Sequence, residues 1–158
     1  MPRMSEERSP RNDEGVTGRA PDERSYAPAG HDGATAHESA YALFVRGRDL
    51  NAARHHAQAA IVLERAARQA PGKGSILEAL GRAYYNSGQH DRARATFEEL
   101  LEIDPSAHYA HYALGQSLKQ LGRSNEARTH LRLAVALDPS SELYQAALGR
   151  LPPSRNAR

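Results

Sequence analysis

The chain has 158 residues with a formal net charge of +2, and 39% of the residues are hydrophobic. A chain of this length can form one domain with a substantial core but leaves little room for a second. It contains no cysteine, which excludes disulfides and thiolate metal sites. No apolar run approaches the roughly 18 residues that span a membrane, and the first ten residues lack the apolar core of a secretion signal. We therefore expect a cytoplasmic protein that has no membrane-bound part.

Residues 1–37 form the first segment of distinct composition. Val16 is its single branched aliphatic residue, among Pro, Gly, Ser and charges of both signs. Such a segment buries too little apolar surface to offset the entropy lost on ordering. Its five Arg and seven acidic residues give it a charge of −2, which leaves +4 for the rest of the chain. The composition predicts a disordered tail before a mildly basic domain, and that charge does not imply nucleic acid.

A period of 34 residues runs through the rest of the chain without insertion or deletion. Four glycines keep this spacing: Gly47, Gly81, Gly115 and Gly149. Three prolines and three alanines also keep it: Pro71, Pro105 and Pro139, and Ala59, Ala93 and Ala127. Large apolar residues follow the same register: Leu63, Phe97 and Leu131. Such a period is typical of solenoids. It predicts copies at about 40–73, 74–107 and 108–141 within a domain that spans 38–151.

Each copy has the pattern of two helices joined by a turn. In the second copy the first helical stripe is Leu77, Leu80, Gly81 and Tyr84. Gly88 follows as a residue suited to a left-handed helix end. The second stripe is Ala93, Phe97, Leu100 and Leu101, and Pro105 stops the helix. Each copy is therefore predicted to be a helical hairpin, although the first copy has Arg54 where the others have a turn glycine.

Residues 142–151 look like a fourth first helix that no second helix follows. Pro152 and Pro153 prevent the helix from continuing. Gln145 stands at a position that would otherwise pack, as expected of a helix with one face in water. The pattern predicts a polar capping helix, followed by a disordered carboxyl terminus at 152–158. No equivalent cap precedes the first copy, so we expect its hairpin to be partly exposed, which keeps a homo-oligomer as an alternative.

These residues resemble those of the tetratricopeptide repeat family, whose 34-residue pattern is W-x2-L-G-x2-Y, A-x3-F and P. The resemblance covers residues 40 to about 151 and implies an all-α, right-handed superhelical solenoid of three repeats and a capping helix. The first copy matches less closely, because it has Arg46 where the others have leucine. We expect the glycine of the first helix and the alanine of the second to let the two backbones approach closely, so that a side chain at Gly81 would overpack the contact.

No motif in the sequence supports catalysis or cofactor binding. PGKGS at 71–75 lacks the glycine and hydroxyl spacing of a phosphate loop, and we expect it to be the turn between two repeats. His108 and His111 share a helix face, but the spacing supplies no third ligand, so structural histidines are the favoured interpretation. A nucleophile elbow and paired carboxylates are also absent from the sequence. We expect no enzymatic activity, no metal and no cofactor.

The surface stripe beside the packed stripe of each first helix is the predicted binding site. It comprises Tyr41, Phe44, Arg48 and Asn51; Glu78, Arg82, Tyr85 and Asn86; Tyr109, Tyr112, Gln116 and Lys119; and Arg150. In the family that this chain resembles, such positions line a concave groove that receives an extended peptide. The groove would be aromatic and basic, which favours a protein or peptide partner with acidic and apolar groups.

The resemblance also allows one well-known ligand to be tested by position. Family members that bind the carboxyl-terminal tail of chaperones need lysine and asparagine where this chain has Phe44 and Arg48. They also need asparagine in place of Ala79, and lysine and arginine in place of Tyr109 and Ala113. All five are different here, so a chaperone tail is not expected. The first alternative function is that of a structural or self-assembling subunit. A helical repeat that binds RNA is less favoured, because a charge of about +4 is modest for phosphate contacts.

Overall fold

The computed structural model describes residues 37–154, which form seven α-helices. In chain order these are α1 (Ala40–Ala52), α2 (His56–Gln69), α3 (Gly74–Asn86), α4 (His90–Ile103), α5 (His108–Gln120), α6 (Ser124–Leu137) and α7 (Glu142–Gly149). This part of the chain has no β-strand. The predicted disordered tail lies outside the described residues except at its last position, as do residues 155–158.

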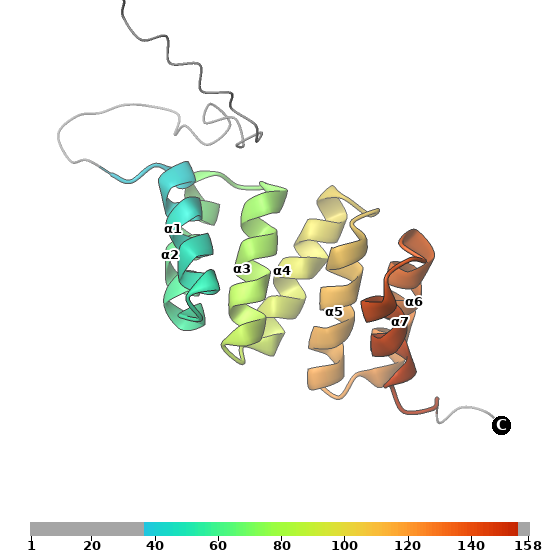
Figure 1. Cartoon of the computed structure of the whole chain (residues 1–158). Helices are drawn as coiled ribbons and strands as arrows, with labels where there is room; N and C mark the ends of the chain where they lie inside the picture. Colours follow the sequence, from blue (N-terminus) through green and yellow to red (C-terminus); the bar gives the residue numbers. More distant parts are fainter. Residues whose placement is uncertain (1–36, 155–158) are drawn as a thin grey trace, which may run out of the picture.

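The helices form three successive hairpins and a last single helix. Helix α1 packs on α2, α3 on α4, and α5 on α6, while α7 packs on α6 (Figure 1). Neighbouring hairpins are joined through α2 with α3 and through α4 with α5, and the first helices also touch one another. The molecule is therefore the all-α solenoid of three repeats and a capping helix that the sequence predicts.

Close packing within each hairpin accounts for the glycines that recur every 34 residues. A β-carbon at Gly81 would lie 2.6 Å from Cζ of Phe97, and one at Gly115 would lie 2.7 Å from Cγ of Leu131. At Gly47 it would collide with Leu63. The β-carbon would thus collide mainly with the large apolar side chain of the second helix, and at Gly115 it would also lie 3.2 Å from the carbonyl oxygen of Ala127. The overpacking expected at Gly81 is therefore confirmed.

Gly149 differs from these three glycines. A β-carbon there would meet nothing within 4 Å, because α7 has no second helix to pack against it. Gly149 therefore takes no part in the close packing of the hairpins. The glycine keeps its register in the sequence without the steric reason that operates in the three hairpins.

The turns inside the hairpins need a left-handed residue. Gly88 and Gly122 have φ values of 80° and 76° at the ends of α3 and α5. Arg54 occupies the same position after α1 with a φ of 66°, and among residues 37–154 it is the single non-glycine residue with positive φ. Because a β-carbon disfavours this conformation, the first hairpin is strained at Arg54.

The turns between hairpins use two different solutions. After α4, Asp104 Oδ1 accepts hydrogen bonds from the backbone N–H and the hydroxyl of Ser106 at 3.0 and 2.6 Å. After α2 the carboxylate is replaced by alanine, and Gly72 turns the chain with a φ of 73° instead. The PGKGS segment is therefore the turn between the first and second repeats, and its Gly74 begins α3.

The first helix of the first hairpin carries exposed charge where the next repeat has buried residues. Leu80 and Ala83 of α3 are buried, and the equivalent residues of α1 are Arg46 and Asp49, which are exposed. Arg46 also pairs with Glu38 at 2.6 Å. No helix precedes α1 within residues 37–154.

Candidate functional site

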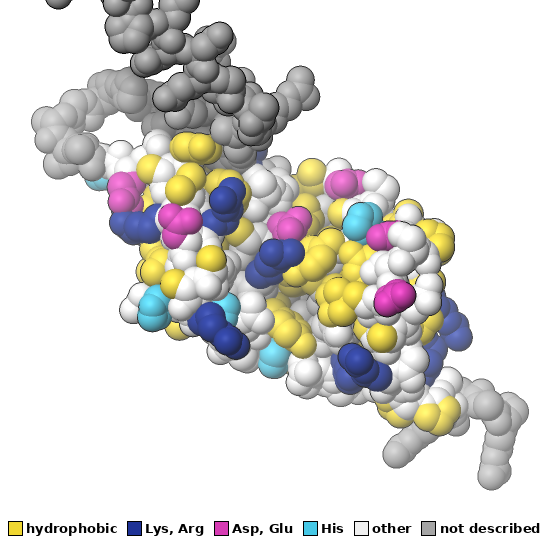
Figure 2. Space-filling model, in the orientation of Figure 1, with side chains coloured by type: hydrophobic (Ala, Val, Ile, Leu, Met, Phe, Trp, Pro, Cys, Tyr) yellow, Lys and Arg dark blue, Asp and Glu magenta, His cyan; other side chains and the backbone are white. Residues whose placement is uncertain are grey.

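Two adjoining clefts lie on the face formed by the first helices of the repeats. The first, here called the cationic cleft, has a volume of about 420 Å³ and is lined by Phe44, Arg48, Asn51, Ala52, His56, Ser75, Glu78, Ala79, Arg82 and Asn86. The second, here called the aromatic cleft, has a volume of about 180 Å³ and is lined by Arg82, Tyr85, Asn86, Phe97, Tyr109, Tyr112, Ala113 and Gln116. Figure 2 shows this face, where hydrophobic side chains gather over α3 and α5 beside basic and acidic ones.

Arg48 and His56 are two polar residues that line the cationic cleft. Arg48 supplies hydrogen-bond donors, and the imidazole of His56 is oriented by Asn51. The Asn51 side-chain N–H donates to the carbonyl of Ala79 at 3.0 Å, which orients the amide. Its Oδ1 then accepts from Nδ1 of His56 at 3.2 Å, so this imidazole nitrogen carries a proton. Arg48 lies with its guanidinium carbon 5.5 Å from the centre of the Phe44 ring. It makes no ion pair with any residue in the range 37–154.

Arg82 lies between the two clefts and lines both. Its Nε donates a hydrogen bond to the Tyr109 hydroxyl at 2.8 Å, and its guanidinium carbon lies 4.5 Å from the centre of the Tyr109 ring. Its Nη2 is 3.5 Å from Oε1 of Glu78, one helical turn earlier. Arg82 is therefore held in place by contacts within its own protein before any ligand arrives.

Aromatic rings continue from Tyr109 toward the carboxyl-terminal end of the stack. The Tyr109 and Tyr112 ring centres are 6.0 Å apart, and those of Tyr112 and Tyr144 are 5.0 Å apart with nearly parallel planes. His108 holds the Tyr144 hydroxyl at 2.8 Å through Nδ1. Such pairs stabilise beyond the area that they bury, so the rings form a rigid apolar wall.

Burial raises the pKa of two tyrosine hydroxyl groups in this wall, those of Tyr109 and Tyr144. It raises the pKa of Tyr109 above its ordinary value, against the opposing effect of the Arg82 charge. It also raises the pKa of Tyr144, with a further contribution from Asp138. Near neutral pH these tyrosines therefore present hydroxyl groups and rings but no negative charge.

The structure brings ten of the thirteen predicted groove residues around the two clefts. Tyr41, Lys119 and Arg150 lie outside both. Phe44 is only 4% exposed, so our placement of this ring on the open surface is wrong, and it serves as the floor under Arg48. The predicted groove is thus centred on α1, α3 and α5 and does not extend as a continuous cleft to Arg150.

Sequence reasoning missed several residues of this face. His56 and Phe97 line the clefts from the second helices of their hairpins, which we did not consider. Ser75 and Leu143 were omitted although they share the 34-residue register of Tyr41 and Tyr109. Leu143 is 54% exposed and places an apolar side chain on the capping helix. The register would have found Ser75 and Leu143, whereas only the folded chain reveals His56 and Phe97.

The histidines do not form a metal site within the described residues. No group of three potential ligands is present there. His111 is buried, with Nε2 2.9 Å from the Pro105 carbonyl and Nδ1 3.1 Å from Nδ1 of His130. The separation of the two Nδ1 atoms is within hydrogen-bond distance. The pair is therefore a hydrogen bond between the two helices of the third repeat.

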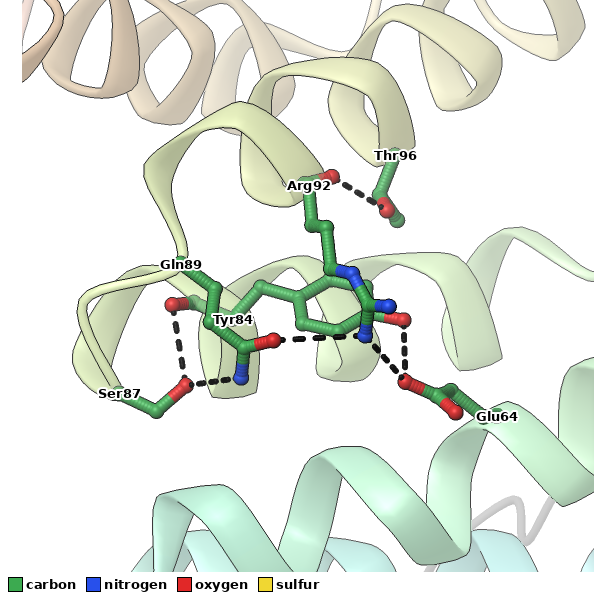
Figure 3. A network of polar contacts seen from close by, with 6 residues as sticks. All are labelled: Glu64, Tyr84, Ser87, Gln89, Arg92 and Thr96. Atoms are coloured by element: carbon green, nitrogen blue, oxygen red, sulfur yellow. Dashed lines mark hydrogen bonds and ion pairs between the residues drawn. The ribbon is translucent and has the colours of Figure 1, made fainter.

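A separate polar network joins the first and second repeats away from the clefts. The Tyr84 hydroxyl donates to Oε1 of Glu64 at 2.7 Å, and Arg92 also reaches this oxygen at 3.1 Å (Figure 3). Gln89 and Ser87 extend the network to the Tyr84 carbonyl. Burial and the hydrogen bond to Glu64 raise the pKa of Tyr84 to about 12. These contacts fix one hairpin on the next and so support the clefts.

Comparison with known proteins identifies the class. The family model described as Tetratricopeptide repeat matches residues 78–142. This match assigns tetratricopeptide repeats to residues 78–142, and the three hairpins with their glycine columns follow the same 34-residue pattern. A comparison with curated protein sequences found no match. None of the described helices is long and apolar enough to cross a membrane.

Solved structures share the fold. The first tetratricopeptide domain of Spaghetti (RPAP3), bound to the HSP90 peptide SRMEEVD, is 15% identical with a TM-score of 0.67, and the match covers 70% of this chain and 87% of that one. The Arabidopsis OM64 domain is 17% identical with a TM-score of 0.68, covering 70% and 92%. The Yersinia enterocolitica secretion chaperone SycD, in complex with a peptide of the translocator YopD, is 18% identical with a TM-score of 0.63, covering 68% and 87%.

Proposed function

We propose that this protein is a non-catalytic interaction module, an adaptor or scaffold that binds a peptide or a partner helix across the cationic and aromatic clefts. The partner carries acidic groups next to apolar ones. Acidic groups pair with the guanidinium groups of Arg48 and Arg82, and apolar side chains enter the aromatic cleft. The domain boundaries that the sequence predicts and a cytoplasmic location belong to this proposal.

One observation carries the proposal: two cationic side chains and an apolar wall of tyrosines adjoin in one hollow face. Exposed aromatic surface gathered in this way is typical of interaction sites. Arg48 has no acidic partner among residues 37–154, so it is available to a ligand. Two of the structural neighbours hold peptides, which supports a peptide as the class of ligand, while the five differing positions argue against a chaperone tail.

Charge reversal in the clefts tests the proposal. The probe is a labelled peptide of alternating glutamate and leucine or phenylalanine, and binding is followed by fluorescence anisotropy. Arg48→Glu combined with Arg82→Glu should abolish binding while the helical circular dichroism stays unchanged. Arg132→Glu, on the exposed side of α6, is the matched control and should bind as the unaltered protein does. Equal affinity of the double variant would place the site elsewhere.

A further inference from the structure

Glu78 is the one acidic residue that lines the cationic cleft. Its side chain is 43% exposed, and its Oε1 atom is 3.5 Å from Nη2 of Arg82. The four other ion pairs in residues 37–154 are shorter, between 2.6 and 3.1 Å. An exposed pair of this length contributes little to stability. The contact between Glu78 and Arg82 is therefore one that a ligand could replace at small cost.

Arg82 does not depend on Glu78 for its position. Its Nε–H is bonded to the Tyr109 hydroxyl, and its guanidinium group lies over the Tyr109 ring. These two contacts use one edge and one face of the guanidinium. The remaining contact, between Nη2 and Glu78, joins two residues that both line the cationic cleft. If the Glu78 carboxylate moved away, the Arg82 guanidinium would stay in place, and its Nη2 group could bind another carboxylate.

The repeat does not require an acid at this position. Phe44 and Tyr112 occupy the equivalent places in the first and third repeats. Among residues 37–154, Glu78 forms no ion pair with a basic side chain other than Arg82. Its negative charge therefore has no structural use that the fold reveals beyond its contact with Arg82. The Glu78 carboxylate would repel an acidic group of the ligand and compete with that group for Nη2 of Arg82.

We propose that Glu78 is a built-in competitor of the acidic ligand and thereby sets the affinity and charge selectivity of the cationic cleft. This inference rests on the function proposed above. In the empty groove Glu78 occupies Arg82, and a peptide carboxylate displaces it while its neighbouring apolar side chain enters the aromatic cleft. Arg48, which has no such competitor, gives the ligand its first electrostatic contact.

The isosteric variant Glu78→Gln tests the inference, because it removes the charge and keeps the shape. With the alternating glutamate peptide as the probe, Kd should fall about two- to five-fold, the range expected when an exposed ion pair no longer competes. The gain should be larger at low salt. A matched peptide with glutamine in place of glutamate should show no gain. Glu98→Gln is the control, because Glu98 pairs with Arg94 four residues away and lines neither cleft.

The outcomes separate this inference from the proposed function. If the glutamate peptide binds the unaltered protein and the double arginine variant loses it, the proposed function stands. Glu78→Gln must then tighten binding, and an unchanged or weaker affinity would overturn the competitor role. Failure of the peptide to bind the unaltered protein would overturn both. If Glu78→Gln folds poorly, Glu78→Ala is the second variant. The NMR signal of the Arg82 Nε–H then reports whether Arg82 keeps its hydrogen bond to Tyr109.

Discussion

The Phe97 ring packs so closely on the backbone of Gly81 that a β-carbon there would lie 2.6 Å from Cζ. This contact joins α3 to α4 at the centre of the molecule, and Phe97 is fully buried. The glycine costs roughly 1 kcal/mol in helix propensity, which the close packing offsets. The same relationship joins Gly47 with Leu63 and Gly115 with Leu131.

Substitution of Gly81 should therefore destabilise the fold. Gly81→Leu overpacks the contact and should lower the free energy of unfolding by roughly 1 to 3 kcal/mol, measured by urea denaturation. Gly149→Ala is the matched control, because nothing lies near its β-carbon position and alanine favours a helix. An equal loss in both variants would show that close packing is not the reason for the glycine column.

Replacement of Arg54 should have the opposite effect. Arg54 holds a φ of 66° where the other hairpins have Gly88 and Gly122. Arg54→Gly relieves that strain at the expense of added freedom in the unfolded chain, with a net gain of about 0.5 to 1 kcal/mol. Gly88→Arg should lose a similar amount. A lower melting temperature for Arg54→Gly would contradict this account of the turn.

Acid should weaken the third repeat through His111 and His130. Because Nε2 of His111 donates to the Pro105 carbonyl, its Nδ1 accepts the proton of His130 Nδ1. Burial, and then the nearness of His111, hold the pKa of His130 below its usual value, although Glu98 and Glu126 oppose this. The unfolded chain therefore takes up a proton first as the pH falls below about 6.5, and stability declines from there.

His130→Gln removes this group and retains a side-chain donor for His111. Its melting temperature should depend less on pH between 7.5 and 5 than that of the unaltered protein. His55→Gln, at an exposed position, is the control and should follow the unaltered curve. Parallel curves for all three proteins would show that the histidine pair does not couple protonation to folding.

Tyr84 should contribute to stability through its hydroxyl group. Tyr84→Phe leaves Glu64 without this donor and should cost about 0.5 to 1.5 kcal/mol in urea denaturation. Since the folded pKa is about 12 and the unfolded value near 10, the folded state keeps the proton longer. The difference between the two proteins should therefore shrink as the pH rises from 10 toward 12. Tyr85→Phe, on the adjacent residue, is the control and should change little.

Much of the fold could be predicted because it repeats. Glycine, alanine and proline recur every 34 residues in three copies, so each copy predicts the same helical hairpin. Agreement of all three copies by chance is excluded. The stripe beside the core followed from the same register, and it contained ten of the residues that line the clefts. The register placed Phe44 on the open surface, whereas its ring is buried beneath Arg48.

The sequence by itself determined the helical hairpins, their number and the face on which side chains gather, because helix periodicity and close backbone packing are local or regularly repeated constraints. Only the tertiary structure decided which of those side chains meet. Arg82 bonds Tyr109 in the next repeat, and Asn51 orients His56 through a carbonyl of α3. Such contacts depend on the angle and distance between stacked helices, to which many small packing interactions contribute and which no single motif encodes.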